Sequence, residues 1–333
     1  MKNFYNIFKI TVSILFIISI SEKTVAQDPH FSQYDASPVV FNPALTGMHG
    51  ADGIGVYSQL RTQWGSMARG LTTTSFALDL PYDEQWGIGA YLLNDNQAEL
   101  LNAFNLVVSG AYKITEPNQK KMRMSVGLQI GFIYKSIKKN ELLFDQQYTD
   151  GTFDPDLPSG ETFIRYHKMM PEINFGFNYT STDNNSTLNS YGGIAVFHVT
   201  NPKESFVSTN NYSRLPFRFV LNGGSKIAIT DEVMVDPNFL LMCQGQDAEY
   251  NFGIRALYSS SGSEFAVNGG INYRLKDAII PFVGFLYKNV TYQLSFDINT
   301  STLKSYSRHR GGVEFFVSFS PMSKNKFGKS LHY

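Results

Sequence analysis

The sequence predicts an all-β protein, a transmembrane antiparallel β-barrel of about 14 strands of the outer-membrane type. Three observations carry this prediction: apolar and polar residues alternate in many segments, an export signal precedes these segments, and the connections between them differ in length in a regular way. The chain has 333 residues, of which 43% are hydrophobic, 14% aromatic and only 17% charged. Such a composition is typical of an ordered protein and not of a disordered one.

The first 26 residues have the pattern of a secretory signal peptide. Lys2 and Lys9 precede an apolar run over 10–20, and Thr24-Val25-Ala26 supplies small residues before Gln27. A basic start, a short apolar core and a small-residue cleavage site are the three parts of such a signal. A membrane-spanning helix needs about 20 apolar residues, so an uncleaved anchor is the less favoured alternative. We therefore expect an exported protein that is cleaved after residue 26.

The rest of the chain shows a period of two. In Val290–Asn299, for example, Tyr292, Leu294 and Phe296 alternate with polar residues, and Glu172–Thr180 follows the same pattern. Alternation over this length indicates a strand with one apolar and one polar face. No stretch after the signal approaches 18 consecutive apolar residues, so helical spans are not expected there. The predicted strands cover 53–61, 70–80, 85–94, 102–114, 121–137, 168–181, 190–199, 216–229, 233–244, 248–259, 264–275, 278–287, 290–299 and 311–320.

Strand length and connection length favour a membrane barrel over a soluble β-sandwich. Strands of soluble proteins average about 5–6 residues, whereas a tilted strand needs about 9–11 to cross a bilayer. The long connections, 136–167, 200–215 and 299–310, and a moderate one, 62–69, all follow odd-numbered strands. Outer-membrane barrels have long external loops and short periplasmic turns. The sequence therefore predicts an outer-membrane location with both termini in the periplasm.

Around the barrel, predicted over 53–320, the sequence predicts a periplasmic N-terminal segment, 27–52, and a periplasmic tail, 321–333. A barrel of this size has a lumen too wide for side chains alone to fill. The segment 27–52 mixes aromatic residues with polar, proline-broken sequence. Three alternatives remain open for it: it folds under or into the barrel, it docks on a periplasmic partner, or it is disordered.

Several functions find no support in the sequence. The 28 basic and 28 acidic residues balance, which argues against a nucleic-acid binder. One cysteine, Cys243, excludes a disulfide framework, and the six histidines show no metal-binding spacing. The acidic stretch 150–156 lacks the ligand spacing of a calcium loop. We expect no enzyme, no cofactor and no metal site, although a barrel enzyme with a non-contiguous Ser/His pair remains an alternative.

Six short motifs resemble one known family over the whole mature chain. They are Gln27-Asp28-Pro29-His30-Phe31-Ser32-Gln33-Tyr34, Asn42-Pro43-Ala44-Leu45-Thr46-Gly47, Arg61-Thr62-Gln63-Trp64, Gly87-Ile88-Gly89, Ser295-Phe296-Asp297-Ile298-Asn299-Thr300-Ser301 and Gly311-Gly312-Val313-Glu314. In this order and spacing they are similar to the PorP/SprF family, outer-membrane components of the type IX secretion and gliding machinery of Bacteroidota.

The resemblance implies a non-enzymatic role in which the barrel helps to export secreted adhesins with type B C-terminal domains, or anchors them at the cell surface. Periplasmic partners of the machinery, peptidoglycan-linked or lipoprotein subunits, are also implied, besides outer-membrane lipid. The alternative function is a transporter that passes small or hydrophobic solutes through the lumen. The long loop after the fifth strand mixes acidic and aromatic residues, a composition suited to protein binding. The candidate partner-binding residues are Phe31, Tyr34, Asn42, Pro43, Arg61, Trp64, Phe144, Tyr148, Phe153, Asp154 and Asp156.

Overall fold

The computed structural model describes residues 28–320 with short gaps. Within this range, positions 50–52, 66–69, 117, 120, 139–141, 150–151, 155, 159, 161–162, 164, 184–185, 207–212, 261–262 and 303 are not described. The predicted signal peptide and the predicted tail, 321–333, also lie outside the described residues.

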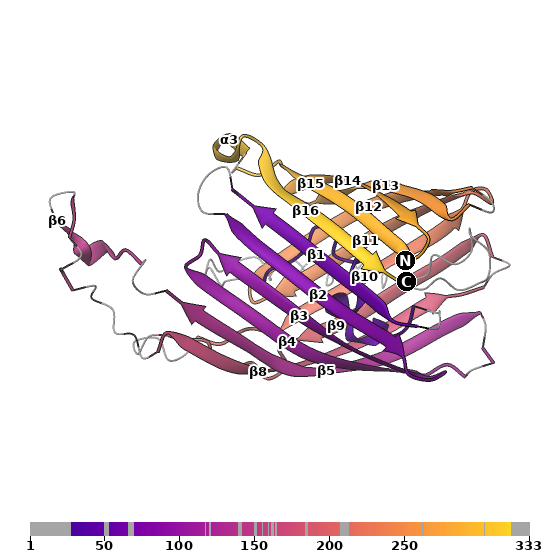
Figure 1. Cartoon of the computed structure of the whole chain (residues 1–333), viewed down its shortest axis with the longest axis horizontal. Coiled ribbons are helices and arrows are strands. Elements are labelled where there is room, and N and C mark those ends of the chain that lie inside the picture. The colour runs from indigo at the N-terminus through magenta and orange to yellow at the C-terminus, as the bar shows by residue number, and fades with distance from the viewer. Residues whose placement is uncertain are drawn as a thin grey trace, which may run out of the picture.

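Fourteen antiparallel strands form a closed barrel in which β1 pairs with both β2 and β16 (Figure 1). Every predicted strand is present, and no end differs from its predicted position by more than about three residues, the usual uncertainty of a boundary. The barrel strands are β1 (Gly55–Gln63), β2 (Leu71–Pro81), β3 (Trp86–Gln97), β4 (Leu101–Lys113), β5 (Met122–Ile137), β8 (His167–Ser181), β9 (Leu188–Phe197), β10 (Arg218–Ala228), β11 (Val233–Gln244), β12 (Asp247–Ser259), β13 (Phe265–Arg274), β14 (Ala278–Tyr287), β15 (Val290–Asn299) and β16 (Arg310–Phe319).

The two faces of the barrel wall differ as the alternation predicts. Leu60, Leu294 and Phe315 point outward and are nearly half exposed, whereas their neighbours Gln59 and Glu314 point inward and are buried. The outer face therefore presents an apolar belt, the surface that lipid requires, and the polar residues face the lumen.

The connections divide the barrel into two ends. At one, here called the loop end, lie the connections after β1, β5, β9 and β15, as predicted for the long loops. They include the short hairpin of β6 (Tyr148–Thr149) and β7 (Thr152–Phe153), and the helix α3 (Lys304–Ser307). Figure 1 shows β6 set well apart from the barrel on its left, on the same side as α3. The opposite end, with the connections after β2, β4 and β8, is called the turn end.

Two short helices precede the barrel strands. The α-helix α2 (Pro38–Phe41) leads directly into the 3₁₀-helix η1 (Pro43–Leu45). Each begins with a proline, which suits the first position of a helix because its missing N–H would have no partner there. Asn42 caps η1, since its Oδ1 accepts the Ala44 N–H at 2.9 Å. Among the described residues, no helix combines the length and apolar character needed to cross a bilayer.

Candidate functional site

Residues 28–49, called the lumen segment below, lie inside the barrel. Asp28 contacts Arg218 and Gln244 at the loop end, whereas Gly47 contacts Asp79 near the turn end. The segment therefore runs along the lumen from one end toward the other before the chain enters β1. Three alternatives were left open for residues 27–52. For residues 28–49, the structure shows that the segment folds into the barrel.

The second half of the lumen segment packs main chain against main chain. A Cβ built on Gly127 of β5 would lie 2.2 Å from the Pro43 carbonyl carbon, and one on Gly87 of β3 would lie 2.1 Å from the Thr46 oxygen. A Cβ on Gly176 of β8 would lie 2.1 Å from Asn42 Oδ1. These glycines form a shallow groove in the wall, here called the glycine track. The main chain of the lumen segment fits into it because glycine has no side chain. Gly47, with φ at +65°, completes it and places its own Cα against Gly87.

Hydrogen bonds from and to side chains of β5 and β2 hold the second half of the lumen segment in the glycine track. Ser125 Oγ donates to the Ala44 carbonyl at 2.6 Å, and the Gly47 N–H donates to Asp79 Oδ2 at 2.5 Å. Gln129 Nε2 donates to the Val39 carbonyl at 2.7 Å. Because buried main-chain groups need partners, these contacts fix the position of the segment as well as its conformation.

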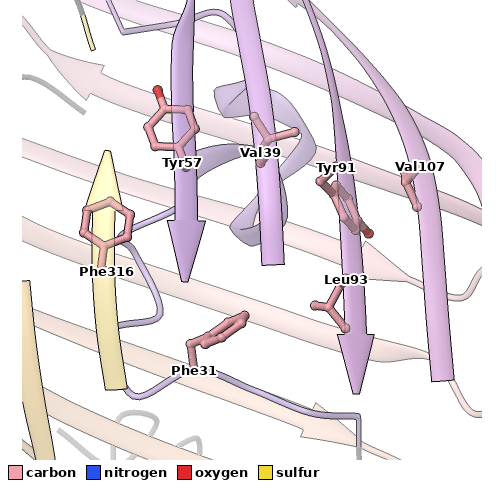
Figure 2. Packing of buried hydrophobic residues seen from close by; sticks show 8 residues of the cluster. Phe31, Val39, Tyr57, Tyr91, Leu93, Val107 and Phe316 are labelled. Carbon is pink, nitrogen blue, oxygen red and sulfur yellow. The ribbon is translucent and has the colours of Figure 1, made fainter. Parts of the chain in front are cut away.

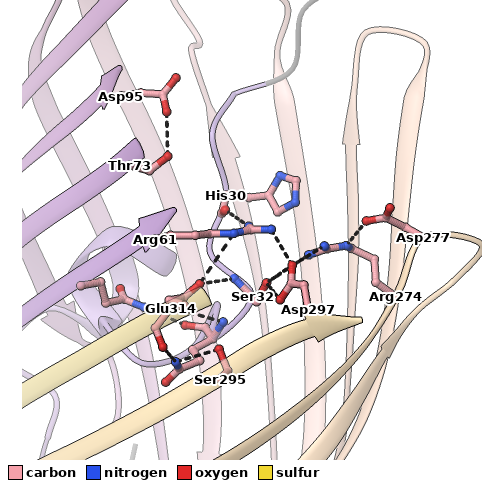
Figure 3. A network of polar contacts seen from close by, with 12 residues as sticks. His30, Ser32, Arg61, Thr73, Asp95, Arg274, Asp277, Ser295, Asp297 and Glu314 are labelled. Atoms are coloured by element: carbon pink, nitrogen blue, oxygen red, sulfur yellow. Dashed lines mark hydrogen bonds and ion pairs between the residues drawn. The ribbon is translucent and has the colours of Figure 1, made fainter. Parts of the chain in front are cut away.

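The first half is held by a buried network of charges and amides (Figure 3). Arg61 Nη2 lies 2.8 Å from Asp297 Oδ2, and its Nη1 donates to the His30 carbonyl. Arg274 Nη2 also lies 2.8 Å from Asp297, whose carboxylate accepts the Ser32 hydroxyl proton at 2.7 Å. Buried charges are stable in such surroundings only when each has oppositely charged and hydrogen-bonding partners.

A second group of charges surrounds Asp28 at the loop end. Its carboxylate contacts His198 and lies 3.1 Å from Arg218 Nη1. His198, which directly follows β9, also places Nδ1 2.8 Å from Glu172. Burial lowers the pKa of His198, but Asp28 and Glu172 outweigh it and raise that pKa to about 9. At neutral pH the imidazolium and the Asp28 carboxylate are therefore both charged.

Apolar side chains of the lumen segment form small clusters with the wall. Phe31 and Val39 pack with Tyr57, Tyr91 and other inward-facing residues (Figure 2). Burying an aromatic side chain contributes about 1.5–3 kcal/mol. These clusters anchor the segment between its two polar regions.

The lumen segment leaves two cavities beside it. One has a volume of about 740 Å³ with its opening included and is lined by Phe31, Val40, Leu240 and Met242, together with the polar groups around Asp28. The other, of about 550 Å³ with its opening included, is lined by the charged residues Asp35, Lys226, Asp236 and Arg255 among others. Tyr34 and Phe41 line both, and their rings stand 5.4 Å apart between them.

The mouth at the loop end is covered in part by the connection after β9. Only Phe175–Thr180 of β8 pairs with β9, so the rest of β8 extends past its neighbour. The Val199 N–H donates to the Ile173 carbonyl at 3.0 Å, and Leu215 is buried against Ile133 and Met170. This connection therefore folds over the lumen.

The connection after β5 has the opposite character, and we call its part 142–166 the arm. Two ring pairs hold it together: Tyr148 with Phe153, at 5.5 Å, and Phe144 with Phe163, at 6.0 Å. Tyr148 remains 48% exposed. The arm thus presents aromatic side chains to its surroundings, away from the barrel (Figure 1).

The candidate partner-binding residues fall into two groups. One group lies in the lumen and is given at the end of this paragraph. The other group belongs to the arm and consists of Phe144, Tyr148, Phe153, Asp154 and Asp156. Asp154 and Asp156 are exposed, and the Asp156 N–H donates to Asp154 Oδ1 at 2.9 Å. Trp64 is half-buried at the loop end, where it follows β1 with φ at +54°. The lumen residues are Phe31, Tyr34, Asn42, Pro43 and Arg61.

Several residues of the lumen network were not singled out as site residues. Asp297 and Glu314 occur in the motifs used for the resemblance, but His198, Arg218 and Arg274 carried no signal beyond being charged residues at the ends of predicted strands. The one feature of the sequence that could have indicated these residues is a charged residue at a position predicted to face the lumen. Which charges meet across the lumen depends on the barrel closing, so it cannot be obtained from one sequence.

Among the described residues, no group of three or more His, Cys, Asp and Glu side chains is arranged to hold a metal ion. Part of the acidic stretch 150–156, including Asp150, lies outside the described residues. The expectation that it lacks a calcium site stays a prediction.

Comparison with solved structures identifies outer-membrane barrels with a similar fold. The Ralstonia pickettii toluene transporter TbuX superposes with a TM-score of 0.50 at 12% identity, over 88% of this chain and 95% of that one. A Pseudomonas aeruginosa FadL homologue gives a TM-score of 0.47 at 10% identity, over 85% and 93%. At these identities the likeness concerns the fold alone. No curated protein matches the sequence.

The family comparison is specific. The model of the type IX secretion system membrane protein PorP/SprF matches residues 24–319, which include the lumen segment, the glycine track and all fourteen barrel strands. The resemblance noted from the six motifs is thereby confirmed. The chain is an outer-membrane β-barrel that belongs to the PorP/SprF family of type IX secretion system membrane proteins.

Proposed function

We propose that this barrel is a subunit of the type IX secretion and gliding machinery that helps to export secreted adhesins with type B C-terminal domains, or anchors them at the cell surface, and links them to periplasmic partners. The family assignment supports the machinery. The observation that carries a binding role is the occupied lumen, in which residues 28–49 are fixed to the wall by buried hydrogen bonds and ion pairs. The exposed arm is the partner-binding surface in this proposal, and no enzymatic step is part of it.

The orientation is part of the proposal. The loop end faces outward, as in barrels with long external loops, and the turn end faces the periplasm. The last described strand, β16, ends at the turn end, and Asp28 lies in the loop-end half of the lumen. We therefore propose that the C-terminus reaches the periplasm, where peptidoglycan-linked or lipoprotein subunits bind, whereas the N-terminus of a chain cleaved after residue 26 lies on the loop-end side.

Removing the paired rings of Tyr148 and Phe153 from the arm should reduce adhesin capture. Aromatic anchors contribute about 2 kcal/mol or more each when they fill a partner pocket, so Tyr148→Ala with Phe153→Ala should weaken binding by at least about tenfold. The measurement is recovery of a recombinant type B C-terminal domain by the purified full-length barrel. Thr149→Ala with Thr152→Ala changes the same hairpin without removing a ring and should leave recovery unchanged.

Two outcomes would contradict this proposal. One is undiminished recovery by the variant without the two rings, which would exclude the arm as the binding surface. The other is a gene deletion that leaves all surface adhesins in place, which would exclude the anchoring role altogether.

A transporter of small or hydrophobic solutes is the second candidate, and the largely apolar cavity of about 740 Å³ favours it. Conductance separates the two. Because the lumen segment occupies the barrel and the connection after β9 covers part of its mouth, the wild-type protein in planar bilayers should be nearly silent. Steady conductance, or uptake of an aromatic hydrocarbon into vesicles, would support transport instead.

A further inference from the structure

The wall around residues 28–33 binds the main chain of the segment rather than only its side chains. Glu314 accepts the N–H groups of Ser32 and Gln33, at 2.7 and 3.0 Å. Gln59 Nε2 donates to the Gln33 carbonyl at 3.0 Å, and Arg61 donates to the His30 carbonyl. Two carbonyls and two amides are thus recognised (Figure 3). Ser32 and Gln33 form a bend, so both of their N–H groups reach the same carboxylate, and a bent main chain presents such groups whatever its sequence.

Side-chain contacts add a preference to this main-chain recognition. The Asp28 carboxylate binds Arg218 and His198. Phe31 enters the apolar cluster of the wall, as Figure 2 shows, and the Ser32 hydroxyl donates to Asp297. The wall therefore suits a segment with an acidic residue, an aromatic residue three positions later and a small hydroxyl residue after that.

The two halves of the lumen segment differ in how they can leave the wall. Residues 42–47 lie in the glycine track, where main-chain atoms are in contact on both sides. Residues 28–33 are instead held by side chains of the wall, and 28–31 border the cavity of about 740 Å³. Cleavage at the predicted site would place residue 28 one position from the new N-terminus. The first half can then detach without threading, while the second half stays bound.

We propose that the wall formed by Gln59, Arg61, Arg218 and Glu314 is a binding site for a bent polypeptide segment of the secreted partner, which enters from the loop end. In the resting barrel the chain's own residues 28–33 occupy this site, and the partner segment exchanges with them. The source of the segment rests on the proposed function, but the site itself is tested with a defined peptide.

The probe is a fluorescent peptide with the sequence of residues 27–35, added to the full-length barrel in detergent. Asp28→Asn with Phe31→Ala in the barrel weakens the resident segment and leaves the wall intact. This variant should bind the peptide at least about tenfold more tightly than the wild type. Adding Glu314→Gln should remove that gain. A peptide carrying the Asp28→Asn and Phe31→Ala changes should bind neither protein.

Cysteine labelling gives a readout that needs no weakened variant. In a Cys243→Ser background, Ser32→Cys should react slowly with a soluble maleimide. Excess peptide should accelerate the reaction, because the peptide takes the place of the resident segment on the wall and so exposes the cysteine of that segment. Ser37→Cys, buried at the start of α2, should stay protected. Equal peptide affinity for wild type and weakened variant, or labelling that the peptide does not accelerate, would overturn the proposal.

The two proposals fail separately. If a type B C-terminal domain is captured but the peptide never exchanges, the partner binds outside the lumen and the exchange site is wrong. If the peptide exchanges but no secreted adhesin is retained, the site stands and the proposed function is wrong.

Discussion

Replacing Arg61 by methionine should destabilise the folded barrel by about 3–5 kcal/mol, the usual effect of removing one partner from a buried ion pair. The Arg61 side chain is 1% exposed and lies between Asp297 and Glu314. Methionine fills a similar volume without charge or donors. Asp297 keeps Arg274 at 2.8 Å, but the His30 carbonyl loses its Arg61 donor. Because Asp297 still has one cationic partner, we expect the destabilisation to lie near the lower end of that range.

Urea unfolding in lipid vesicles, followed by the gel mobility shift between folded and unfolded barrel, measures this change. Arg308→Met is the matched control, because Arg308 is exposed at the loop end and should change stability by less than about 0.5 kcal/mol. If the two variants unfold at the same urea concentration, the network around Asp297 does not stabilise the barrel.

The barrel could be predicted from the sequence because its signal is local. A strand such as Val290–Asn299 shows its two faces within ten residues, and the parity of loop lengths needs only the order of the strands. Elements without such a period were not predicted: the hairpin β6–β7 and helix α3 lie inside connections for which the sequence indicated length and composition but no secondary structure.

The position of the lumen segment could not be predicted for the opposite reason. The motifs Asn42–Gly47 and Gly87–Gly89 were both recognised, but only the structure brings them into contact. Glycine in a strand indicates a bend or a close approach without naming what approaches. Likewise Arg61 and Asp297 are far apart in the sequence, and their pairing follows from closure of the barrel through β16.

Replacing Gly127 by valine should displace the lumen segment and open the barrel. The nearest atoms to a new Cβ are the Pro43 carbonyl carbon and oxygen, at 2.2 and 2.3 Å, and the Ala44 nitrogen, at 2.4 Å. These are main-chain atoms of a helix capped by Asn42, so no side-chain rotation relieves the contact. Overpacking of this kind costs about 1–3 kcal/mol, which acts on the segment because the strands on either side of Gly127 remain paired.

The expected result is steady conductance in planar bilayers, where we expect the wild type to be nearly silent, together with faster cleavage of the lumen segment by added protease. Gly110→Val is the matched control, since a Cβ at Gly110 has no atom within 4 Å among the neighbours considered. It should conduct no more than the wild type. A silent Gly127→Val barrel that resists protease would mean that the glycine track tolerates a side chain, and close main-chain packing would then not be what keeps the lumen closed.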